Sequence, residues 1–252
     1  MTTITRHDPK RQGDARFYEI DGIKYPSVTS VLSVINKPAL IPWATKTALE
    51  SARRELVNFV GEDSLYGGKR EITLADVDGI IERAKKKPNE VRDAAADIGT
   101  RAHAAFDAFI ATGKVIVPDH DLMQPFENFH AWYRERQFAK LEGERVVYSQ
   151  MFGYAGSLDA LGITEEGRHI VVDFKTSNGL YPEFVAQVAA YRMALAEMGV
   201  NVAREAHLVR FGKDKPEFEA HRFDGAALEA AFEAFKGALA IFRWQHAGKA
   251  GA

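Results

Sequence analysis

The chain contains no cysteine, which excludes disulfide bonds, zinc sites built from thiolates and cysteine nucleophiles. This absence fits a reducing cytosol. No uninterrupted apolar run approaches the roughly 20 residues that a membrane-spanning helix needs. The polar start, residues 1–16, lacks the apolar stretch of a signal peptide. We therefore expect a cytoplasmic protein with no membrane partner.

Neither glycine, with 20 residues, nor proline, with 9, is in excess, so the composition gives no sign of disorder. A length of 252 residues suffices for one core with a sizeable appendage. The net charge of -2 argues against a protein that coats nucleic acid by charge alone. It remains compatible with a local basic groove, or with a metal ion that supplies positive charge at a phosphate.

Hydrophobic periodicity predicts a mostly helical first half. Residues 1–16 look like a mobile polar leader, and a short strand pair follows that turns at Asp21-Gly22. In the helical part, Thr73 is the expected cap of one helix and Pro88 its expected stop. The expected strands are 17–20 and 23–25, and the expected helical segments are 26–59, 74–87, 90–111 and 121–139.

The apolar period changes to two after residue 144, which predicts strands. Pro182 begins a further helix that Gly199 ends, and Asp224 caps the last helix. We therefore expect an α/β fold with a central mixed sheet flanked by helices. The expected strands are 145–152, 155–164, 168–175, 205–211 and 217–223, with the last helix at 226–246. The expected divisions are a flexible leader 1–16, a helical subdomain 17–88 and a core 89–252.

The second and third of these strands form a predicted hairpin whose register can be counted. If residues 165–167 form a three-residue loop with its glycine in the left-handed conformation, Thr164 pairs with Arg168. Counting back from that pair places Asp159 opposite Asp173. Opposed residues on antiparallel strands share a face, with Cβ atoms about 4.5–5.5 Å apart. The two carboxylates should therefore lie side by side.

Lys175 lies two residues beyond Asp173 and should project from the same face. Two acids and an amine on one small surface suit hydrolysis of a phosphodiester bond. Carboxylates hold a hard divalent cation, which polarises the phosphate and lowers the pKa of an attacking water. Lys175 would orient that water or stabilise negative charge in the transition state. The alternative is a solvated cluster of surface charges, yet Asp159 and Asp173 both interrupt otherwise apolar strands.

Four short elements follow one another along the chain. They are Gly99-Thr100-Arg101-Ala102-His103, Gly156-Ser-Leu-Asp159-Ala, Val172-Asp173-Phe174-Lys175-Thr176-Ser177, and Gln187 with Tyr191. Together they resemble the PD-(D/E)XK nuclease superfamily, in particular its RecB-like branch of phage exonucleases and the mitochondrial genome maintenance exonuclease. Each element alone is common by chance, whereas the ordered set is specific. The resemblance covers about residues 89–211, and residues 25–32 also look like the entry segment of such exonucleases.

The resemblance implies a restriction-endonuclease-like core in which Asp159 and Asp173 ligate Mg²⁺ or Mn²⁺ with the backbone carbonyl of Phe174. Lys175 would be the catalytic lysine, and His103 would add a nitrogen ligand from the preceding helix. The implied activity is that of a DNA exonuclease, in preference to an endonuclease, in replication, recombination or repair. Its substrate would be single-stranded DNA or DNA ends. The entry segment also suggests a phage source.

His103 needs its own argument, because a lone histidine on a helix is more often a surface residue or a satisfied core residue. Gly99 lies one turn earlier on the same face, and an interior helical glycine costs about 1 kcal/mol relative to alanine. Its presence suggests close approach of another backbone or a substrate. Thr100 and Arg101 beside it are candidate phosphate contacts. With the family pattern added, we favour His103 as a metal ligand.

Further candidates come from the flanking segments. Gln187 and Tyr191 are four residues apart and share a helix face, from which both could reach the DNA or a metal-bound water. The alternative is an amide and a phenol at the edge of the core. Glu144 is a candidate additional acid, and Glu142 is equally plausible from sequence. Ser177, in the third element, is a candidate substrate contact.

The helical first half carries scattered positive charge and two aromatic residues of interest. Trp43 or Tyr66 could stack on the bases of a single strand, with core packing as the alternative for Trp43. The lysine run is equally explained by a solvated helix end. The basic residues are Lys46, Arg53, Arg54, Lys69, Arg70 and the run 85–87.

Other functions are weighed against a nuclease. A catalytically silent DNA-binding or assembly module would predict damage to a metal or lysine position, and all of these positions are present. A hydrolase of nucleotides or small phosphoesters shares the logic of two carboxylates. The stretches His-Glu-x-x-His, Gly-x-x-x-x-Gly-Lys and Gly-x-Gly-x-x-Gly are absent. This disfavours a metalloprotease, a P-loop protein and a dinucleotide-binding protein.

Overall fold

The structure is a computed structural model that describes residues 2–9, 14–66, 72–116 and 119–247, without the side chains of 60–66. The chain divides into two compact units. The first unit joins residues 1–35 with residues 99–252, and the second consists of residues 36–98. Every strand that the structure describes belongs to the first unit.

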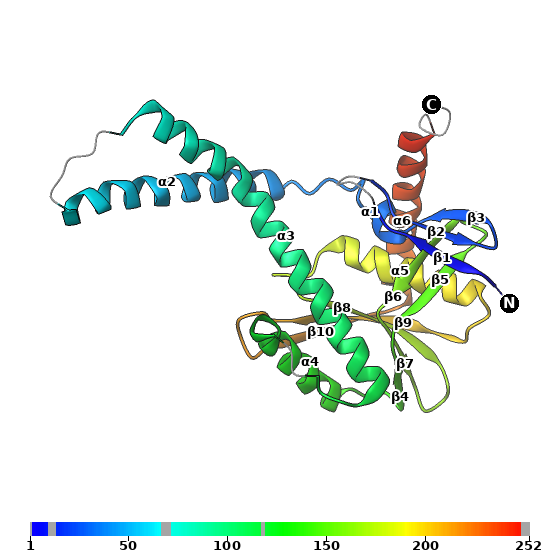
Figure 1. Ribbon diagram of the computed structural model, residues 1–252. Helices are drawn as coiled ribbons and strands as arrows, with labels where there is room; N and C mark the ends of the chain where they lie inside the picture. Colours follow the sequence, from blue (N-terminus) through cyan, green and yellow to red (C-terminus); the bar gives the residue numbers. More distant parts are fainter. Residues whose placement is uncertain (1, 10–13, 67–71, 117–118, 248–252) are drawn as a thin grey trace. The chain divides into compact units, whose positions relative to one another are not determined.

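A five-stranded mixed sheet forms the centre of the first unit, with the strand order β10-β9-β8-β7-β4 (Figure 1). Strands β8 and β9 are parallel, and the other neighbours are antiparallel. The predicted α/β fold with a mixed sheet is thus confirmed. The strands are β4 (Lys140–Glu142), β7 (Ala160–Ile163), β8 (His169–Lys175), β9 (Val202–Phe211) and β10 (Phe218–Phe223).

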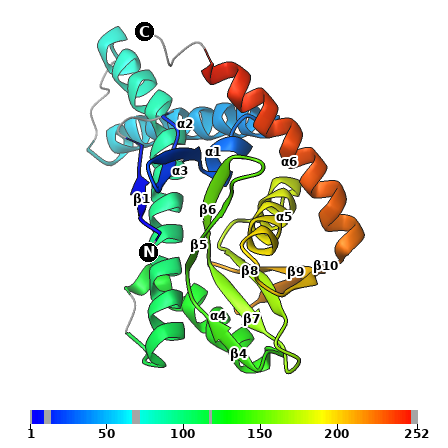
Figure 2. The ribbon, with the colours of Figure 1, turned by 90° about the vertical axis from the view of Figure 1, so that its right-hand side faces the viewer.

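Helices cover both faces of this sheet (Figures 1 and 2). Helices α5 (Pro182–Glu197) and α6 (Gly225–His246) pack on one face, and α4 (Met123–Glu135) packs on the other, after a short 3₁₀ turn at His120–Leu122. The Asp224 side chain caps α6 by accepting a hydrogen bond from the backbone of Ala227, as predicted.

The two faces bury different cores. Leu208 and its neighbours pack against α5 and α6 in a hydrophobic cluster of aliphatic and aromatic residues. On the other face, Phe174 and Phe211 join Phe106 and Phe129 in an aromatic cluster. The Phe106 and Phe129 rings stack with their centroids 4.4 Å apart. Because side chains alternate along a strand, Phe174 enters the aromatic cluster while its neighbours on β8 face α5.

Two smaller sheets complete the first unit. Strands β5 (Arg145–Ser149) and β6 (Tyr154–Leu158) pair antiparallel, and α1 (Val28–Leu32) packs beside β6. The third sheet has the order β1-β2-β3. Its last turn has left-handed residues at Asp21 and Gly22, with φ of 49° and 82°, as the sequence predicts for a tight hairpin. These strands are β1 (Ile4–His7), β2 (Phe17–Ile20) and β3 (Ile23–Pro26).

Three expectations need correction at the N-terminal side. The expected leader contains β1, because residues 4–7 pair with β2. The expected helical subdomain of residues 17–88 gives up its first part to the first unit, since the buried Tyr18 and Tyr25 pack with Ala155 of β6. The boundary within the helices lies at residues 98 and 99 rather than at 88 and 89.

Helix α3 (Leu74–Thr112) is one helix where the sequence suggested two. Thr73 caps it as predicted, accepting a hydrogen bond from the backbone of Asp76. Pro88 lies inside the helix and does not end it. A proline removes one backbone hydrogen bond, but the residues on both sides of Pro88 are good helix formers, so the helix continues. Helix α2 (Leu40–Tyr66) precedes α3 in the chain.

Trp43 of α2 has 38% of its surface exposed, so the packing alternative does not describe it. Lys46, Lys85 and Lys87 form ion pairs within their own helices. The side chain of Tyr66 and the residues Lys69 and Arg70 lie outside the described part. Within the described part of the chain, no helix is long and apolar enough to cross a membrane.

Candidate active site

Asp159 lies at a bend between two sheets. The sequence suggested one strand through residues 155–164, but β6 ends before Asp159 and β7 begins after it. Strand β6 belongs to the two-stranded sheet with β5, and β7 belongs to the central sheet. The bend brings the Asp159 carboxylate to the border of both sheets.

The predicted hairpin register is confirmed. Ala160 pairs with Val172, and the same count places Asp159 opposite Asp173. At the loop end, the backbone N–H of Thr164 donates to the Arg168 carbonyl at 3.0 Å. The loop glycine, Gly167, has a φ of 72°, as the three-residue loop requires.

Both oxygens of Asp159 are engaged. The backbone N–H of Phe174 donates to Oδ2 at 2.8 Å, and His103 Nδ1 lies 3.2 Å from Oδ1. His103 comes from α3 and retains 34% of its side-chain surface. The structure therefore brings His103 to the predicted acid, although 56 residues separate the two in sequence.

Asp173 is buried, with 1% of its side chain exposed, and it faces Lys175. The Lys175 ammonium forms an ion pair with Asp173 Oδ2 and donates to Gln187 Oε1 at 3.3 Å. Gln187 Nε2 donates to Asp173 Oδ1 at 3.0 Å. The three side chains thus form a closed ring of contacts between β8 and α5. An ion pair this deeply buried depends on such additional hydrogen bonds.

Tyr191 is buried and contacts Gln187, one of these three side chains. Its hydroxyl accepts the second Gln187 amide hydrogen at 3.1 Å, and only 2% of the residue is exposed. A Cβ atom at Gly156 would lie 2.5 Å from the Tyr191 ring, so the glycine in the second sequence element makes room for that ring. Tyr191 would therefore act through Gln187.

The acids and the histidine have displaced pKa values. Burial raises the pKa of Asp173 to about 6, although the neighbouring Lys175 charge opposes the shift. Burial also favours the neutral form of Asp159, but His103 and Lys175 outweigh it and hold the Asp159 pKa below its ordinary value. For His103, burial opposes the charged form, while the Asp159 carboxylate prevails and raises the pKa. The pKa values of the two neighbouring carboxylates are thus shifted in opposite directions.

The weaker candidates lie near the site in different ways. Gly99 approaches a side chain and not a backbone, since its Cβ would lie 3.4 Å from Thr176 Oγ1. Thr100 is exposed. Arg101 forms ion pairs with Asp119 and Asp121 at 2.8 and 3.1 Å, so contact with phosphate would compete with those carboxylates. The Ser177 hydroxyl donates to the Gly179 carbonyl within its own loop.

The structure distinguishes Glu144 from Glu142. Glu144 accepts a hydrogen bond from Ser157, which lies two residues before Asp159 on β6. Glu142 instead pairs with Lys140 on its own strand, with 2.8 Å between Lys140 Nζ and Glu142 Oε1. Of the two candidate acids, Glu144 is therefore the one connected to the strand that leads into Asp159.

Two residues near the site escaped the sequence analysis. Asp107 accepts the backbone N–H of Glu144 at 2.9 Å, and it lies four residues after His103 on the same helix. Phe184 places its ring centroid 4.7 Å from the Lys175 ammonium. It lies three residues before Gln187. Helical spacing from a recognised residue was the available signal for both.

The donors suit a hard divalent cation, which prefers carboxylate and carbonyl oxygen. The buried Asp173 Oδ2 makes no hydrogen bond within the described residues and has only the ammonium as its partner. Within those same residues, no three His, Asp or Glu side chains are grouped as a metal site. Asp173 is turned toward Lys175 and Gln187, so metal binding would require it to share its oxygens with the cation.

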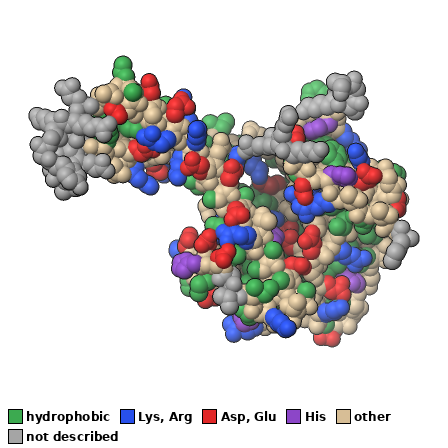
Figure 3. Space-filling view, viewed as in Figure 1, with side chains coloured by type: hydrophobic (Ala, Val, Ile, Leu, Met, Phe, Trp, Pro, Cys, Tyr) green, Lys and Arg blue, Asp and Glu red, His purple; other side chains and the backbone are tan. Residues whose placement is uncertain are grey.

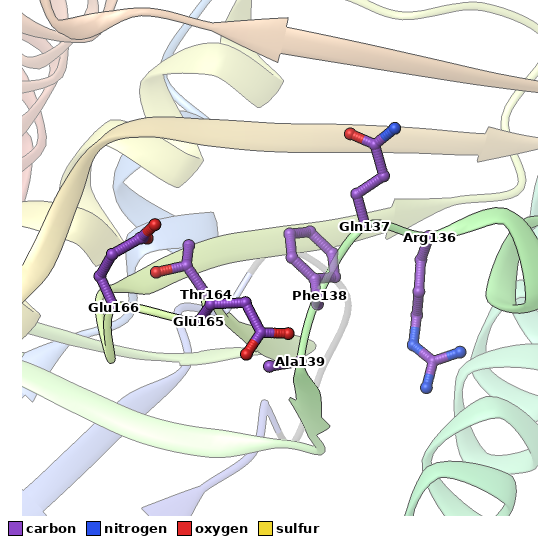
Figure 4. A pocket seen from close by; sticks show the side chains of 7 residues that line it. All are labelled: Arg136, Gln137, Phe138, Ala139, Thr164, Glu165 and Glu166. Atoms are coloured by element: carbon purple, nitrogen blue, oxygen red, sulfur yellow. The ribbon is translucent and has the colours of Figure 1, made fainter.

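A surface pocket lies at the other end of β8 from Lys175, beside the loop between β7 and β8 (Figure 4). It contains none of the predicted site residues, and its lining includes two acids. It therefore has no part in the site. Its lining residues are Arg136, Gln137, Phe138, Ala139, Thr164, Glu165 and Glu166.

Comparisons with known proteins add little to this geometry. No protein-family model matches the chain, and no curated protein matches it. Among solved structures, a protein called SSO0001 is 18% identical with a TM-score of 0.28, over 55% of this chain and 71% of that one. A protein from Eubacterium rectale described as a "putative exonuclease" is 10% identical with a TM-score of 0.39, over 73% and 72%. Similarities this distant do not support an inference about activity.

Proposed function

We propose that the chain is a metal-dependent DNA nuclease that hydrolyses phosphodiester bonds. The observation that carries the proposal is the position of Asp159, whose carboxylate accepts the N–H of Phe174 next to Asp173, with the Lys175 ammonium against the buried Asp173. Two acids and one amine on one face are what phosphodiester hydrolysis needs, and a solvated charge cluster would not bury Asp173. Asp159, Asp173, the Phe174 carbonyl and His103 would hold Mg²⁺ or Mn²⁺.

Each of the site residues has its own role in the proposed reaction. The bound metal ion would polarise the scissile phosphate and lower the pKa of a water molecule. Asp159 is held in place by His103 and the Phe174 N–H, which keeps its carboxylate ionised for the cation. Lys175 would orient the water or stabilise the charge that develops on the phosphate. Gln187 holds Lys175 and Asp173 in one arrangement, with Tyr191 supporting its amide.

The finer features of the proposal rest on the four sequence elements. They favour an exonuclease over an endonuclease and a role in DNA replication, recombination or repair. They also favour single strands or DNA ends as the substrate. The principal alternatives are an endonuclease of the same fold and a silent DNA-binding module, and one experiment separates them.

The test compares the wild-type protein with Lys175→Ala on end-labelled and internally labelled DNA in Mg²⁺, Mn²⁺ or EDTA. Linear single and double strands are used beside a circular control. We expect metal-dependent loss of linear DNA and a decrease of at least about 100-fold in the variant, the scale of loss of one preorganised charge. Lys140→Ala, which removes an exposed lysine of β4, is the matched control and should retain activity.

Each remaining result points to a different conclusion. Cleavage of the circular DNA would make the protein an endonuclease. Metal binding without degradation of any DNA would overturn the proposed activity and support the silent module. Full activity of Lys175→Ala would remove the lysine from the mechanism while leaving the nuclease in place.

A further inference from the structure

The exposed residue Tyr181 is separated from the proposed catalytic lysine, Lys175, by the ring of Phe184. The Phe184 ring contacts the Lys175 ammonium at 4.7 Å, and its other neighbour is Tyr181. The centroids of the Tyr181 and Phe184 rings are 5.5 Å apart, with the planes at 76°. These two contacts place Tyr181 beside the surface where Lys175 would meet a phosphate.

Tyr181 is exposed in a way that the other aromatic residues of the site are not. It has 47% of its surface exposed, whereas Phe174 and Tyr191 have 1% and 2%. Its hydroxyl has no hydrogen-bond partner among the residues that the structure describes. Its backbone is part of the start of α5, because Tyr181 is the N-cap of that helix and its carbonyl accepts the Phe184 N–H at 2.9 Å. The backbone of Tyr181 is therefore held at the start of α5, while its side chain is accessible to solvent.

The charge distribution explains why such a ring would be useful. On the face shown in Figure 3, acidic and basic side chains of the described residues are interspersed. The chain as a whole carries a net charge of -2. Attraction of the phosphate backbone, which falls steeply with salt, is weak for such a protein. Stacking of bases on aromatic rings provides affinity that needs neither net charge nor a particular base, because every base has a π-face.

We propose that Tyr181 stacks on an unpaired nucleobase next to the phosphate held at Lys175. The inference rests on the proposed nuclease function and specifies its substrate class as a polynucleotide with an unpaired base at the cut. Phe184 supports the Tyr181 ring by an edge contact while it contacts Lys175, so the base and the phosphate are positioned by two connected side chains. A base inside an intact duplex is stacked on its neighbours and unavailable to the ring.

The test measures KM and kcat on a labelled single strand for wild type, Tyr181→Ala and Tyr181→Phe. Loss of one stacked base corresponds to about a ten-fold weaker interaction, so Tyr181→Ala should raise KM about ten-fold with little change in kcat. Tyr181→Phe keeps the ring and should retain the wild-type KM. Trp244→Ala removes another exposed aromatic residue, on α6 with 79% exposure, and should have no effect.

The second arm places a single abasic nucleotide at successive positions along the strand. In the wild-type protein, an abasic nucleotide at one position should raise KM about as much as Tyr181→Ala does. In Tyr181→Ala, the same abasic strand should bring no further loss, because the partner ring is already missing. An unchanged KM in Tyr181→Ala, or an equal abasic penalty in both proteins, would overturn the stacking role.

Failure of the nuclease is distinguishable from failure of this inference. If the wild-type protein cleaves no DNA, equilibrium binding of the same labelled strands is measured by fluorescence anisotropy. Binding that is weakened by both the abasic site and Tyr181→Ala would support the ring contact without the activity. Absence of binding, or binding that neither change weakens, would overturn it.

Discussion

Burial of the Asp173 carboxylate lowers the stability of the fold, yet the same carboxylate is a proposed metal ligand. The carboxylate is buried, and it is kept there by Lys175 and Gln187. Removing one member of a buried ion pair costs about 3–5 kcal/mol, because the other charge is left without a partner. Lys175→Ala must therefore be shown to be folded, by its circular dichroism and urea unfolding, before its lost activity is assigned to chemistry.

Gly156 offers a prediction about packing at the same site. Gly156→Ala would drive a methyl group into the Tyr191 ring, which lies 2.5 Å from the Cβ position. We expect a loss of about 1–3 kcal/mol in the free energy of unfolding, measured in urea, because an overpacked core must shift side chains or backbone. Nuclease activity should fall as well, since Tyr191 supports Gln187.

The control for this prediction is Gly237→Ala in α6. A Cβ at Gly237 meets nothing within 4 Å, and the residue lies inside a helix. This substitution should stabilise the protein by about 0.5–1 kcal/mol, because alanine is the better helix former. Equal effects of the two substitutions would contradict the account of Gly156.

The His103 and Asp159 pair predicts a pH dependence in metal-free protein. The His103 pKa is raised above 6.5, so its contribution to stability is complete below that pH and is lost as the pH rises through the folded value. The Asp159 pKa is lowered below 3.8, so its contribution is present above that pH and is lost as the pH falls through the folded value. The pair should stabilise most between about pH 4 and 6.5.

NMR titration of the His103 imidazole in EDTA measures this effect. The pKa should lie above the ordinary value in the wild-type protein and should drop in Asp159→Asn, where burial acts without the opposing carboxylate. The stability lost in Asp159→Asn should be larger at about pH 5.5 than at about pH 8.5. A His103 pKa that Asp159→Asn leaves unchanged would show that the two groups do not interact in solution.

At the scale of elements, the site depends on four segments that are far apart in the sequence. The bend between β6 and β7 places Asp159, the end of β8 places Asp173 and Lys175, and α5 places Gln187. Helix α3 adds His103 from across the fold. Each side chain is thus held by an element with its own packing, so small displacements of a helix would change the distances between them.

Helix α6 supports this arrangement through the hydrophobic core that it shares with α5. Asp224→Ala removes the side-chain acceptor that caps its first turn. We expect a loss of about 1 kcal/mol in the free energy of unfolding, measured in urea. Asp224→Asn keeps an acceptor in place and should remain close to wild type. Equal losses in both variants would mean that the carboxylate charge, and not the cap, is what stabilises the helix.

At the scale of the whole molecule, the two faces of the central sheet have different roles. Its face toward α4 buries an aromatic cluster around Phe174, and the His103 ring contacts this cluster at its edge. Its face toward α5 carries Asp173 and Lys175 at the end of β8. Because alternate residues of one strand face opposite sides of the sheet, Phe174 packs in the aromatic cluster while Asp173 and Lys175 face α5.

Much of this organisation could be predicted from local patterns. The hairpin register followed from loop length and a glycine, and α5 and α6 followed from Pro182 and Asp224. Three features were missed for physical reasons. The bend at Asp159 arises because β6 and β7 pair with different strands. Strand β4 is only three residues long. Pro88 was expected to end a helix, but it lies inside α3.

The sequence by itself determined which residues alternate, which turns are tight and which acids face each other, because these depend on neighbours a few positions away. Tertiary structure decided the rest. The contact of His103 with Asp159, the hydrogen bonds of Gln187 with Asp173 and Lys175, and the ring of Phe184 over Lys175 join segments that no local period relates. Such contacts depend on how packed helices and strands fill the core, and that arrangement is a property of the whole chain.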